Sequence, residues 1–171
     1  MVDLKTQYHR IKDEIDGAFQ DVLESTAFIK GPQVKAFSKN LAEYLNVQHV
    51  VPCGNGTDAL QLALMALDLK PGDEVITPDF TFISTAEVIK FLGLEPVLGD
   101  VDREDFNISV DKLREAITDR TKAVIPVHLF GQCANMDEIN RLARENDIVV
   151  IEDAAQSLGS EYYTDGRYRK D

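Results

Sequence analysis

The sequence predicts an α/β protein in which a mostly parallel sheet is covered by helices on both faces. Short runs rich in β-branched residues alternate with helical segments, which is the pattern of parallel strands joined by helices. These runs are continuously apolar, as expected when neither face of the sheet meets water. With 171 residues, 44% of them hydrophobic and 28% charged, the chain is globular in composition and long enough to bury one core.

Two amphipathic helices are predicted ahead of the sheet, across residues 8–45. Apolar residues recur at steps of three and four over residues 8–23 and again over residues 34–45. This spacing draws one apolar stripe along a helix. Gly31 and Pro32 interrupt the pattern, so we expect the first helix to end before them and the second to follow them.

Strands and helices alternate after residue 48. The predicted strands are the apolar runs 49–51, 74–77, 96–98, 123–127 and 148–151. The predicted helices lie between them, near 57–67, 82–92, 110–117 and 136–146. Asn135 and Glu138 form a variant of the capping box at the start of the last helix. No internal repeat or linker interrupts the series, so we expect one α/β layer domain with the helices in front.

The charge and the cysteine content argue against several classes of protein. The chain has 18 Lys and Arg against 30 Asp and Glu, a formal charge of −12 with no basic block, so we expect no nucleic-acid partner. Its apolar stretches are far shorter than a membrane span and its first residues show no apolar signal core, so we expect no membrane association and a cytoplasmic location. Cys53 and Cys133 predict neither a disulfide framework nor a metal site.

Four strand-to-helix turns carry the residues best suited to bind a ligand, because ligands of open parallel sheets bind beyond the carboxyl ends of the strands. These turns are 52–58, 77–82, 128–132 and 152–157. In the first turn, Gly56 and Thr57 open a helix, where backbone amides and a hydroxyl could cradle a phosphate. The alternative is an ordinary turn in which Thr57 or Asn55 caps the helix.

A dinucleotide site is a competing interpretation of the same turn. Gly54, Gly56 and Ala59 satisfy the spacing Gly-x-Gly-x-x-Ala. Asp79 ends the next strand about where a ribose-binding acid would be needed. On this interpretation the chain would be a noncatalytic dinucleotide-binding module.

The last turn favours a flat ligand that carries a positive charge. Asp153 follows a buried strand, where a lone carboxylate is costly unless a cation such as a protonated pyridine nitrogen is bound beside it. Ala154 and Ala155 are small enough for a ring to lie close, and the Gln156 amide could bond a ring oxygen. The alternative role for Asp153 is a helix N-cap.

Aromatic and histidine side chains complete the set of candidates. Phe80 and Phe82 could each stack on a planar cofactor, although a single phenylalanine at such a place is more often part of the core. His128 ends a strand near the same edge, where a lone histidine is more often a hydrogen-bonded structural residue than an acid or a base.

Six motifs occur in order along nearly the whole chain. They are Gln7-Tyr8, 29–34 (Ile-Lys-Gly-Pro-Gln-Val), 56–60 (Gly-Thr-Asp-Ala-Leu), 71–76 (Pro-Gly-Asp-Glu-Val-Ile), 121–131 (Thr-Lys-Ala-Val-Ile-Pro-Val-His-Leu-Phe-Gly) and 152–157 (Glu-Asp-Ala-Ala-Gln-Ser). Together they resemble the motifs of the DegT/StrS-like sugar aminotransferases. The resemblance implies the aspartate-aminotransferase fold, pyridoxal 5′-phosphate (PLP) as cofactor, glutamate as amino donor, a nucleotide-linked keto sugar as substrate, and a homodimer.

Carried over position by position, the resemblance implies a role for five residues. Gly56 and Thr57 would hold the cofactor phosphate, and Phe82 would stack on the ring. Asp153 would pair with the pyridine nitrogen, and Gln156 would bond the ring hydroxyl oxygen. The dinucleotide interpretation gives Asp153 and Gln156 no comparable task.

One departure from the family pattern concerns the catalytic lysine. The family places its Schiff-base lysine beyond the position of Asp153, in a segment resembling Ser-Phe-x-x-x-Lys-x-x-Gly, and this chain has no such segment. Its only lysine after Asp153 is Lys170, in a polar tail with no predicted strand before it. We therefore expect no catalytic residue within the chain and no turnover by the chain alone.

The same departure bears on the fold and on the reaction. The resemblance implies that residues 1–171 are the amino-terminal part of the PLP-binding large domain of a longer enzyme, without the rest of that domain and the small carboxyl-terminal domain. Open sheet edges and uncovered helix faces are then expected. A PLP-dependent sugar dehydratase of the same fold stays an alternative, because the histidine that replaces the lysine in such enzymes would lie beyond Asp171.

Overall fold

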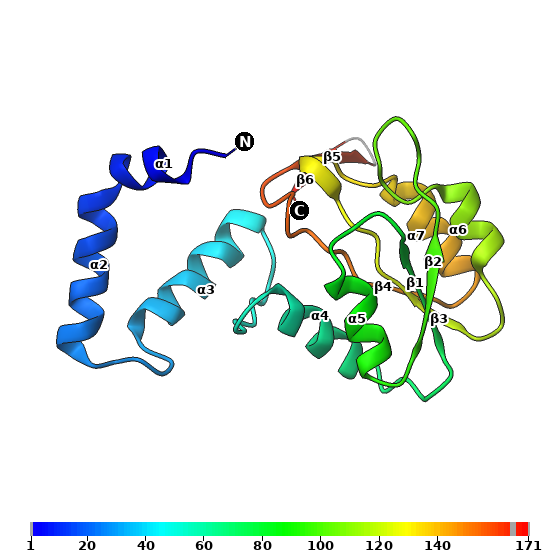
Figure 1. The fold of residues 1–171 in the computed structure, drawn as a ribbon, viewed down its shortest axis with the longest axis horizontal. Coiled ribbons are helices and arrows are strands. Elements are labelled where there is room, and N and C mark those ends of the chain that lie inside the picture. The colour runs from blue at the N-terminus through cyan, green and yellow to red at the C-terminus, as the bar shows by residue number, and fades with distance from the viewer. Residues whose placement is uncertain (1, 165–166, 171) are drawn as a thin grey trace. The chain divides into compact units, whose positions relative to one another are not determined.

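The computed structural model describes residues 2–164 and 167–170, and the chain divides into two compact units, Met1–Pro52 and Cys53–Asp171. The first unit is helical, and the second holds a parallel sheet with its covering helices (Figure 1). In the described ranges, no helix combines the length and the apolar character needed to cross a membrane.

Three helices make up the first unit: α1 (Leu4–Arg10), α2 (Lys12–Ser25) and α3 (Pro32–Leu45). Asp3 caps α1 by accepting a hydrogen bond from the Thr6 amide at 3.0 Å, and this bond holds the pKa of Asp3 below its usual value. The predicted helix over 8–23 differs from the structure, because Ile11, with a φ of −119°, separates α1 from α2.

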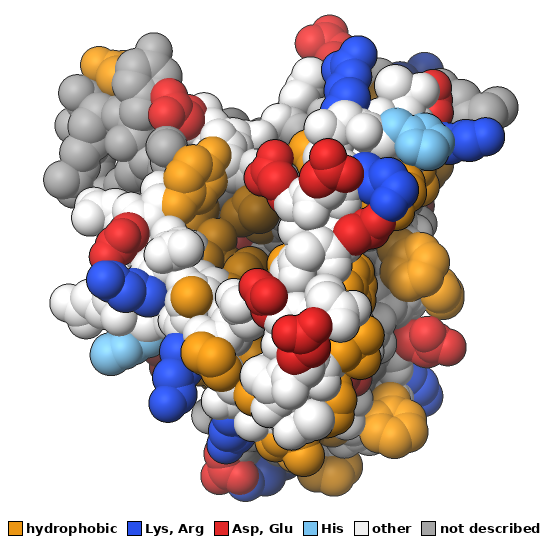
Figure 2. Space-filling view, turned by 90° about the vertical axis from the view of Figure 1, so that its left-hand side faces the viewer, with side chains coloured by type: hydrophobic (Ala, Val, Ile, Leu, Met, Phe, Trp, Pro, Cys, Tyr) orange, Lys and Arg blue, Asp and Glu red, His pale blue; other side chains and the backbone are white. Residues whose placement is uncertain are grey.

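The apolar stripes of α2 and α3 lie at the surface of the helical unit. None of the residues in these helices is buried, and Phe19, Leu23 and Phe37 are exposed. Figure 2 shows hydrophobic side chains at the surface with acidic side chains between them. The helical unit, taken alone, therefore leaves apolar area in contact with water.

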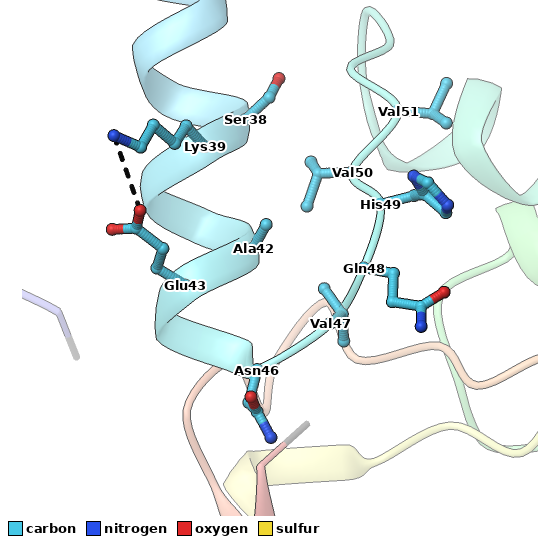
Figure 3. Close-up of a pocket in the computed structure, with 10 residues that line it drawn as sticks. All are labelled: Ser38, Lys39, Ala42, Glu43, Asn46, Val47, Gln48, His49, Val50 and Val51. Carbon is cyan, nitrogen blue, oxygen red and sulfur yellow. Dashed lines mark ion pairs between the residues drawn. The ribbon is translucent and has the colours of Figure 1, made fainter.

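The strand predicted at 49–51 is not formed, which corrects the sequence analysis. These residues belong to an irregular segment beside α3, where Val50 faces the helix and Val51 is 81% exposed (Figure 3). Together with α3, the segment lines an open groove. A strand requires a neighbour that donates and accepts backbone hydrogen bonds, and no strand in the described part of the chain pairs with this segment.

The second unit is built on a four-stranded parallel sheet in the order β2-β1-β3-β4. Its strands are β1 (Glu74–Pro78), β2 (Glu95–Gly99), β3 (Thr121–Val124) and β4 (Val149–Val150). One face is covered by α4 (Gly56–Met65) and α5 (Ser84–Phe91), and the other by α6 (Val110–Ala116) and α7 (Met136–Glu145) (Figure 1). The predicted fold class, a parallel sheet with helices on both faces, is confirmed.

Both faces of this sheet are buried, and neighbouring residues of one strand face opposite layers. Val75 packs in the layer of α4 and α5, with Leu64 and Ile89. Ile76, the next residue, packs in the layer of α6 and α7, with Leu113. Because side chains alternate across a strand, a sheet covered on both faces favours apolar residues at successive positions of its central strands.

A two-stranded antiparallel hairpin follows the sheet, which the sequence analysis missed. In it β5 (Glu161–Thr164) pairs with β6 (Arg167–Lys170), so Lys170 belongs to a strand and another strand precedes it. Tyr162 packs against the layer of α6 and α7, and its hydroxyl accepts a hydrogen bond from the Asp137 amide at 3.4 Å. Burial raises the pKa of the Tyr162 hydroxyl above its usual value.

We expect Ile76→Ala to destabilise the second unit strongly. Ile76 is fully buried, at 0% exposure, in a strand that pairs on both sides, and truncating such a side chain costs about 2–5 kcal/mol. Leu98→Ala, on edge strand β2 where the side chain is 57% exposed, is the matched control and should cost about 0.5 kcal/mol or less. Urea unfolding followed by circular dichroism measures both free energies, and equal losses would contradict this assignment of the core.

Candidate functional site

The predicted turns gather at one edge of the sheet. Its strands are parallel, so the residues that follow them, 79–83, 125–128 and 151–157, lie at the same edge. The chain passes from α4 to the start of β1 at the opposite edge, and from the end of β1 into α5 at this one. The first turns of α4 and α5 therefore lie at the same edge as Asp153.

The start of α4 is capped by Asn55, and two amides there have no partner within the helix. The Asn55 side-chain oxygen accepts from the Asp58 amide at 2.9 Å, and its backbone oxygen accepts from the Ala59 amide at 3.0 Å. The amides of Gly56 and Thr57 lie in the first turn, so the helix has no carbonyl four residues earlier to accept their hydrogen bonds. Nothing lies within 4 Å of the place that a side chain at Gly56 would take. Asn55 is thus the N-cap, and the cap leaves room for an anion.

Backbone pairing fixes Asp153 just beyond β4. Its amide donates to the Pro126 oxygen at 2.9 Å, and its carbonyl accepts from the His128 amide at 3.0 Å. Its carboxylate is half-buried: Oδ1 accepts from the Ala155 amide at 3.2 Å, and Oδ2 accepts from the Thr85 hydroxyl at 3.3 Å. Within the described ranges, no cationic side chain pairs with this carboxylate.

The alternative role for Asp153 as a helix N-cap is wrong. The residues after it, 154–160, form turns and irregular structure, and no helix begins among them. Its bond to the Ala155 amide is a local turn of the kind that aspartate often makes. The Asp153 side chain therefore has no helix end to stabilise.

The short helical turn η1 (Leu129–Gly131) orients the side-chain amide of Gln156. The Gln156 Oε1 accepts a hydrogen bond from the Phe130 amide at 2.9 Å. Because the oxygen is used in this way, Nε2 is left to donate to a ligand. Asp153 thus offers a negatively charged acceptor, and Gln156, three residues further on, offers a neutral donor.

Of the two candidate phenylalanines, Phe82 has the more accessible ring. It lies in the turn before α5, is 72% exposed, and stacks with no other ring in the part of the chain that the structure describes. The Phe80 ring lies 5.5 Å from that of Phe106, which in turn lies 6.2 Å from that of Phe130. Phe80 is therefore part of an aromatic cluster, whereas Phe82 has a face open to a ligand.

His128 is held as a structural residue. Its side chain is fully buried, Nδ1 accepts from the Ala134 amide at 3.1 Å, and Nε2 lies 3.0 Å from a carboxylate oxygen of Glu152. Because Nδ1 accepts, the ring proton resides on Nε2 and is donated to Glu152. Both ring nitrogens are used within the protein, so the structural interpretation of His128 is favoured over a role as acid or base.

Two residues near the site were missed by the sequence analysis. The first is Thr85, in the first turn of α5, whose hydroxyl contacts Asp153. The sequence carries a signal for Thr85: it is a polar residue, next to Ser84, on the side of α5 that also buries Val88.

The second missed residue is Asn107, which is only 2% exposed although it lies in a loop. Its side-chain oxygen accepts from the Leu129 amide at 3.1 Å, and its side-chain nitrogen donates to the Gln132 oxygen at 3.3 Å. Asn107 therefore braces the loop whose Phe130 amide holds Gln156. No periodic pattern surrounds it, so the sequence gives no signal for this role.

The donors and acceptors at this edge fit PLP in their chemistry. They comprise one carboxylate, two helix-terminal amides and one carboxamide donor, with an exposed phenyl ring in a neighbouring turn. PLP carries the complementary groups, namely a basic ring nitrogen, a phosphate, a ring hydroxyl oxygen and a flat ring.

The fold matches part of the large domain of PLP-dependent transferases. The model of the DegT/DnrJ/EryC1/StrS aminotransferase family matches residues 9–168, and the chain belongs to that family. It is 50% identical over 161 residues to the UDP-2-acetamido-2-deoxy-3-oxo-D-glucuronate aminotransferase of Pseudomonas aeruginosa, covering 94% of this chain and 45% of that protein. It is 45% identical, with 94% and 44% covered, to the UDP-N-acetyl-3-dehydro-alpha-D-glucosamine 3-aminotransferase of Acidithiobacillus ferrooxidans.

Solved structures agree with this assignment. A DegT/DnrJ/EryC1/StrS aminotransferase from Brucella abortus superposes with a TM-score of 0.89 at 44% identity, covering 92% of this chain and 44% of that one. NtdA from Bacillus subtilis, solved with bound cofactor PMP, superposes with a TM-score of 0.83 at 39% identity, with 86% and 34% covered. The chain thus spans less than half the length of these relatives.

We expect Asn107→Leu to loosen the loop at 129–133. The substitution leaves the buried Leu129 amide without its acceptor, at a cost of about 1–3 kcal/mol. Hydrogen exchange followed by mass spectrometry should show faster exchange in this loop. Asn135→Ala is the control, because it removes the N-cap of the nearby helix α7 and leaves the bonds of Asn107 in place. It should leave the exchange rates of residues 129–133 unchanged. Unaltered protection of the loop in Asn107→Leu would refute the bracing role.

Proposed function

We propose that this chain is the cofactor-binding part of a PLP-dependent aminotransferase that converts a nucleotide-linked keto sugar to an amino sugar, with glutamate as donor. The observation that carries the proposal is the Asp153 carboxylate, held at the carboxyl edge of the sheet by a hydroxyl and an amide. A half-buried anion that lacks a cationic neighbour in the described ranges suits a protonated pyridine nitrogen.

Five residues hold the cofactor in this proposal. The amides of Gly56 and Thr57 bind the phosphate at the start of α4, where the helix dipole favours an anion. Phe82 stacks on the ring. Asp153 accepts from the ring nitrogen, and Gln156 donates from Nε2 to the ring hydroxyl oxygen.

The protein supplies binding, orientation and charge to this chemistry. When bound, PLP provides an electron sink for the transfer of an amino group. Asp153 keeps a proton on the ring nitrogen, which strengthens the sink, and Gln156 fixes the tilt of the ring. Neither residue replaces the lysine to which such a cofactor is attached, so residues 1–171 should bind and orient the cofactor without turning over substrate.

The proposed substrate class rests on the relatives. The two curated relatives described above are named as aminotransferases of UDP-linked sugars that carry a 3-oxo or 3-dehydro group. By this similarity we propose a nucleotide-linked keto sugar as acceptor, and from the family resemblance of the motifs we propose a homodimer as the working form. Residues 1–171 would be the amino-terminal part of the large domain, with the helices of residues 8–45 ahead of the sheet.

We expect the full chain to bind PLP and Asp153→Asn to weaken that binding at least about tenfold. The substitution removes the charge from a hydrogen bond worth about 1.5–3 kcal/mol when one partner is ionised. Titration of the chain with PLP, followed by the absorbance and fluorescence of the cofactor, measures the dissociation constant.

Asp79→Asn is the matched control for this experiment. Asp79 is an exposed carboxylate after β1 at the same edge, and it is the acid that the dinucleotide interpretation requires. Its substitution should change PLP binding by no more than about twofold. Tighter binding of NAD than of PLP, abolished by Asp79→Asn, would overturn the proposed function.

A further inference from the structure

Thr85 contributes a buried hydroxyl that the proposed cofactor contacts do not use. Its side chain is fully buried in the first turn of α5, and its Oγ1 lies 3.3 Å from Oδ2 of Asp153. Its amide donates to the backbone oxygen of Phe82 at 3.2 Å. One residue therefore contacts the backbone of the exposed phenylalanine and the side chain of the half-buried carboxylate.

We propose that Thr85 is a positioning residue that sets the plane of the Asp153 carboxylate so that it meets a protonated ring nitrogen. The proposal rests on the proposed function and deepens it. In this proposal, the contact from Thr85 makes the site bind a ring that has a basic nitrogen more tightly than a ring of the same shape that lacks one.

The geometry of the carboxylate supports this role. The torsion that turns an aspartate carboxylate has broad, shallow minima, so a single hydrogen bond leaves its plane poorly fixed. In Asp153 each oxygen accepts one hydrogen bond from a different place, Oδ1 from the Ala155 amide two residues along the same turn and Oδ2 from Thr85 on α5. Two anchors fix the plane, and each oxygen keeps a lone pair for a ligand.

The neutral donor at Thr85 matters as much as its position. A lysine or arginine in this place would pair with the carboxylate and cancel its charge before a ligand arrived. A hydroxyl orients the carboxylate and leaves the negative charge in place for a cationic ring. The arrangement therefore combines a fixed direction with an uncompensated charge.

The contact of the Thr85 hydroxyl is a distant one. Because Thr85 lies in the first turn of α5, no preceding turn of that helix offers a carbonyl to its hydroxyl. The hydroxyl contacts a side chain 68 residues further along the chain, at the edge where the candidate site lies.

The test compares two ligands in the full chain. One is PLP, and the other is its 1-deaza analogue, in which a carbon replaces the ring nitrogen. We expect Thr85→Val, which keeps the shape and removes the hydroxyl, to weaken PLP binding about 3–10-fold. It should change binding of the 1-deaza analogue by less than about twofold, and Thr85→Ser, which keeps the hydroxyl, should retain the preference for PLP.

A second readout follows the ring nitrogen itself. The ¹⁵N chemical shift of labelled PLP bound to the chain reports the protonation of that nitrogen. It should move toward the unprotonated value in Thr85→Val and stay at the wild-type value in Thr85→Ser.

Thr77→Val is the matched control. Thr77 is also a fully buried threonine near this edge, but its hydroxyl bonds the backbone oxygen of Ile125 at 3.3 Å and not Asp153. Thr77→Val should lower the free energy of unfolding, measured in urea, by about as much as Thr85→Val does. It should keep the full preference for PLP over the 1-deaza analogue.

The outcomes separate the two proposals. A wild-type chain that binds PLP no better than the 1-deaza analogue contradicts the pairing of Asp153 with the ring nitrogen, and the proposed function fails. A wild-type preference that survives intact in Thr85→Val, or an equal loss of affinity for both ligands, overturns the role of Thr85 and leaves the proposed function standing.

Discussion

The backbone pairing of Asp153 with residues 126–128 is the constraint on which the candidate site depends. Strand β4 is only two residues long, and on its own it would leave Asp153 in an unsupported turn. The isolated bridge between Val127 and Asp153 carries the ladder of β3 and β4 beyond the end of the strand. Since β3 is buried on both faces by the core, the position of this carboxylate is set by the close-packed interior of the second unit.

Much of the fold could be predicted because its signals are local. The continuous apolar runs predicted the strands of the sheet, and Asn135 and Glu138 marked the start of α7. The strand expected at 49–51 depends on a neighbour to pair with, and no pattern within those residues reports whether one exists. The hairpin of β5 and β6 was missed because its strands are only four residues long and carry Glu, Thr, Arg and Lys beside their tyrosines, so they lack the apolar runs that marked the sheet.

The candidate site divides in the same way between local and distant signals. Asp153 and Gln156 stand in one turn after a predicted strand, so their residue types and position sufficed to select them. Thr85 and Asn107 act through hydrogen bonds that span 68 and 22 residues or more, and the partners become neighbours only when the strands assemble. Periodicity describes one element at a time, so it carries no information about such contacts.

In the proposed site, the cap at the start of α4 has a consequence for the size of the anion that this helix end would hold. Asn55 already accepts from the amides of Asp58 and Ala59, so the amides of Gly56 and Thr57 and the Thr57 hydroxyl are the donors left at this end. A phosphomonoester presents three terminal oxygens to these donors, whereas a pyrophosphate presents more oxygens than this helix end can satisfy. Orthophosphate in a buffer would compete for the same donors, so the apparent affinity for any phosphorylated ligand should be lower in phosphate buffer than in a zwitterionic one.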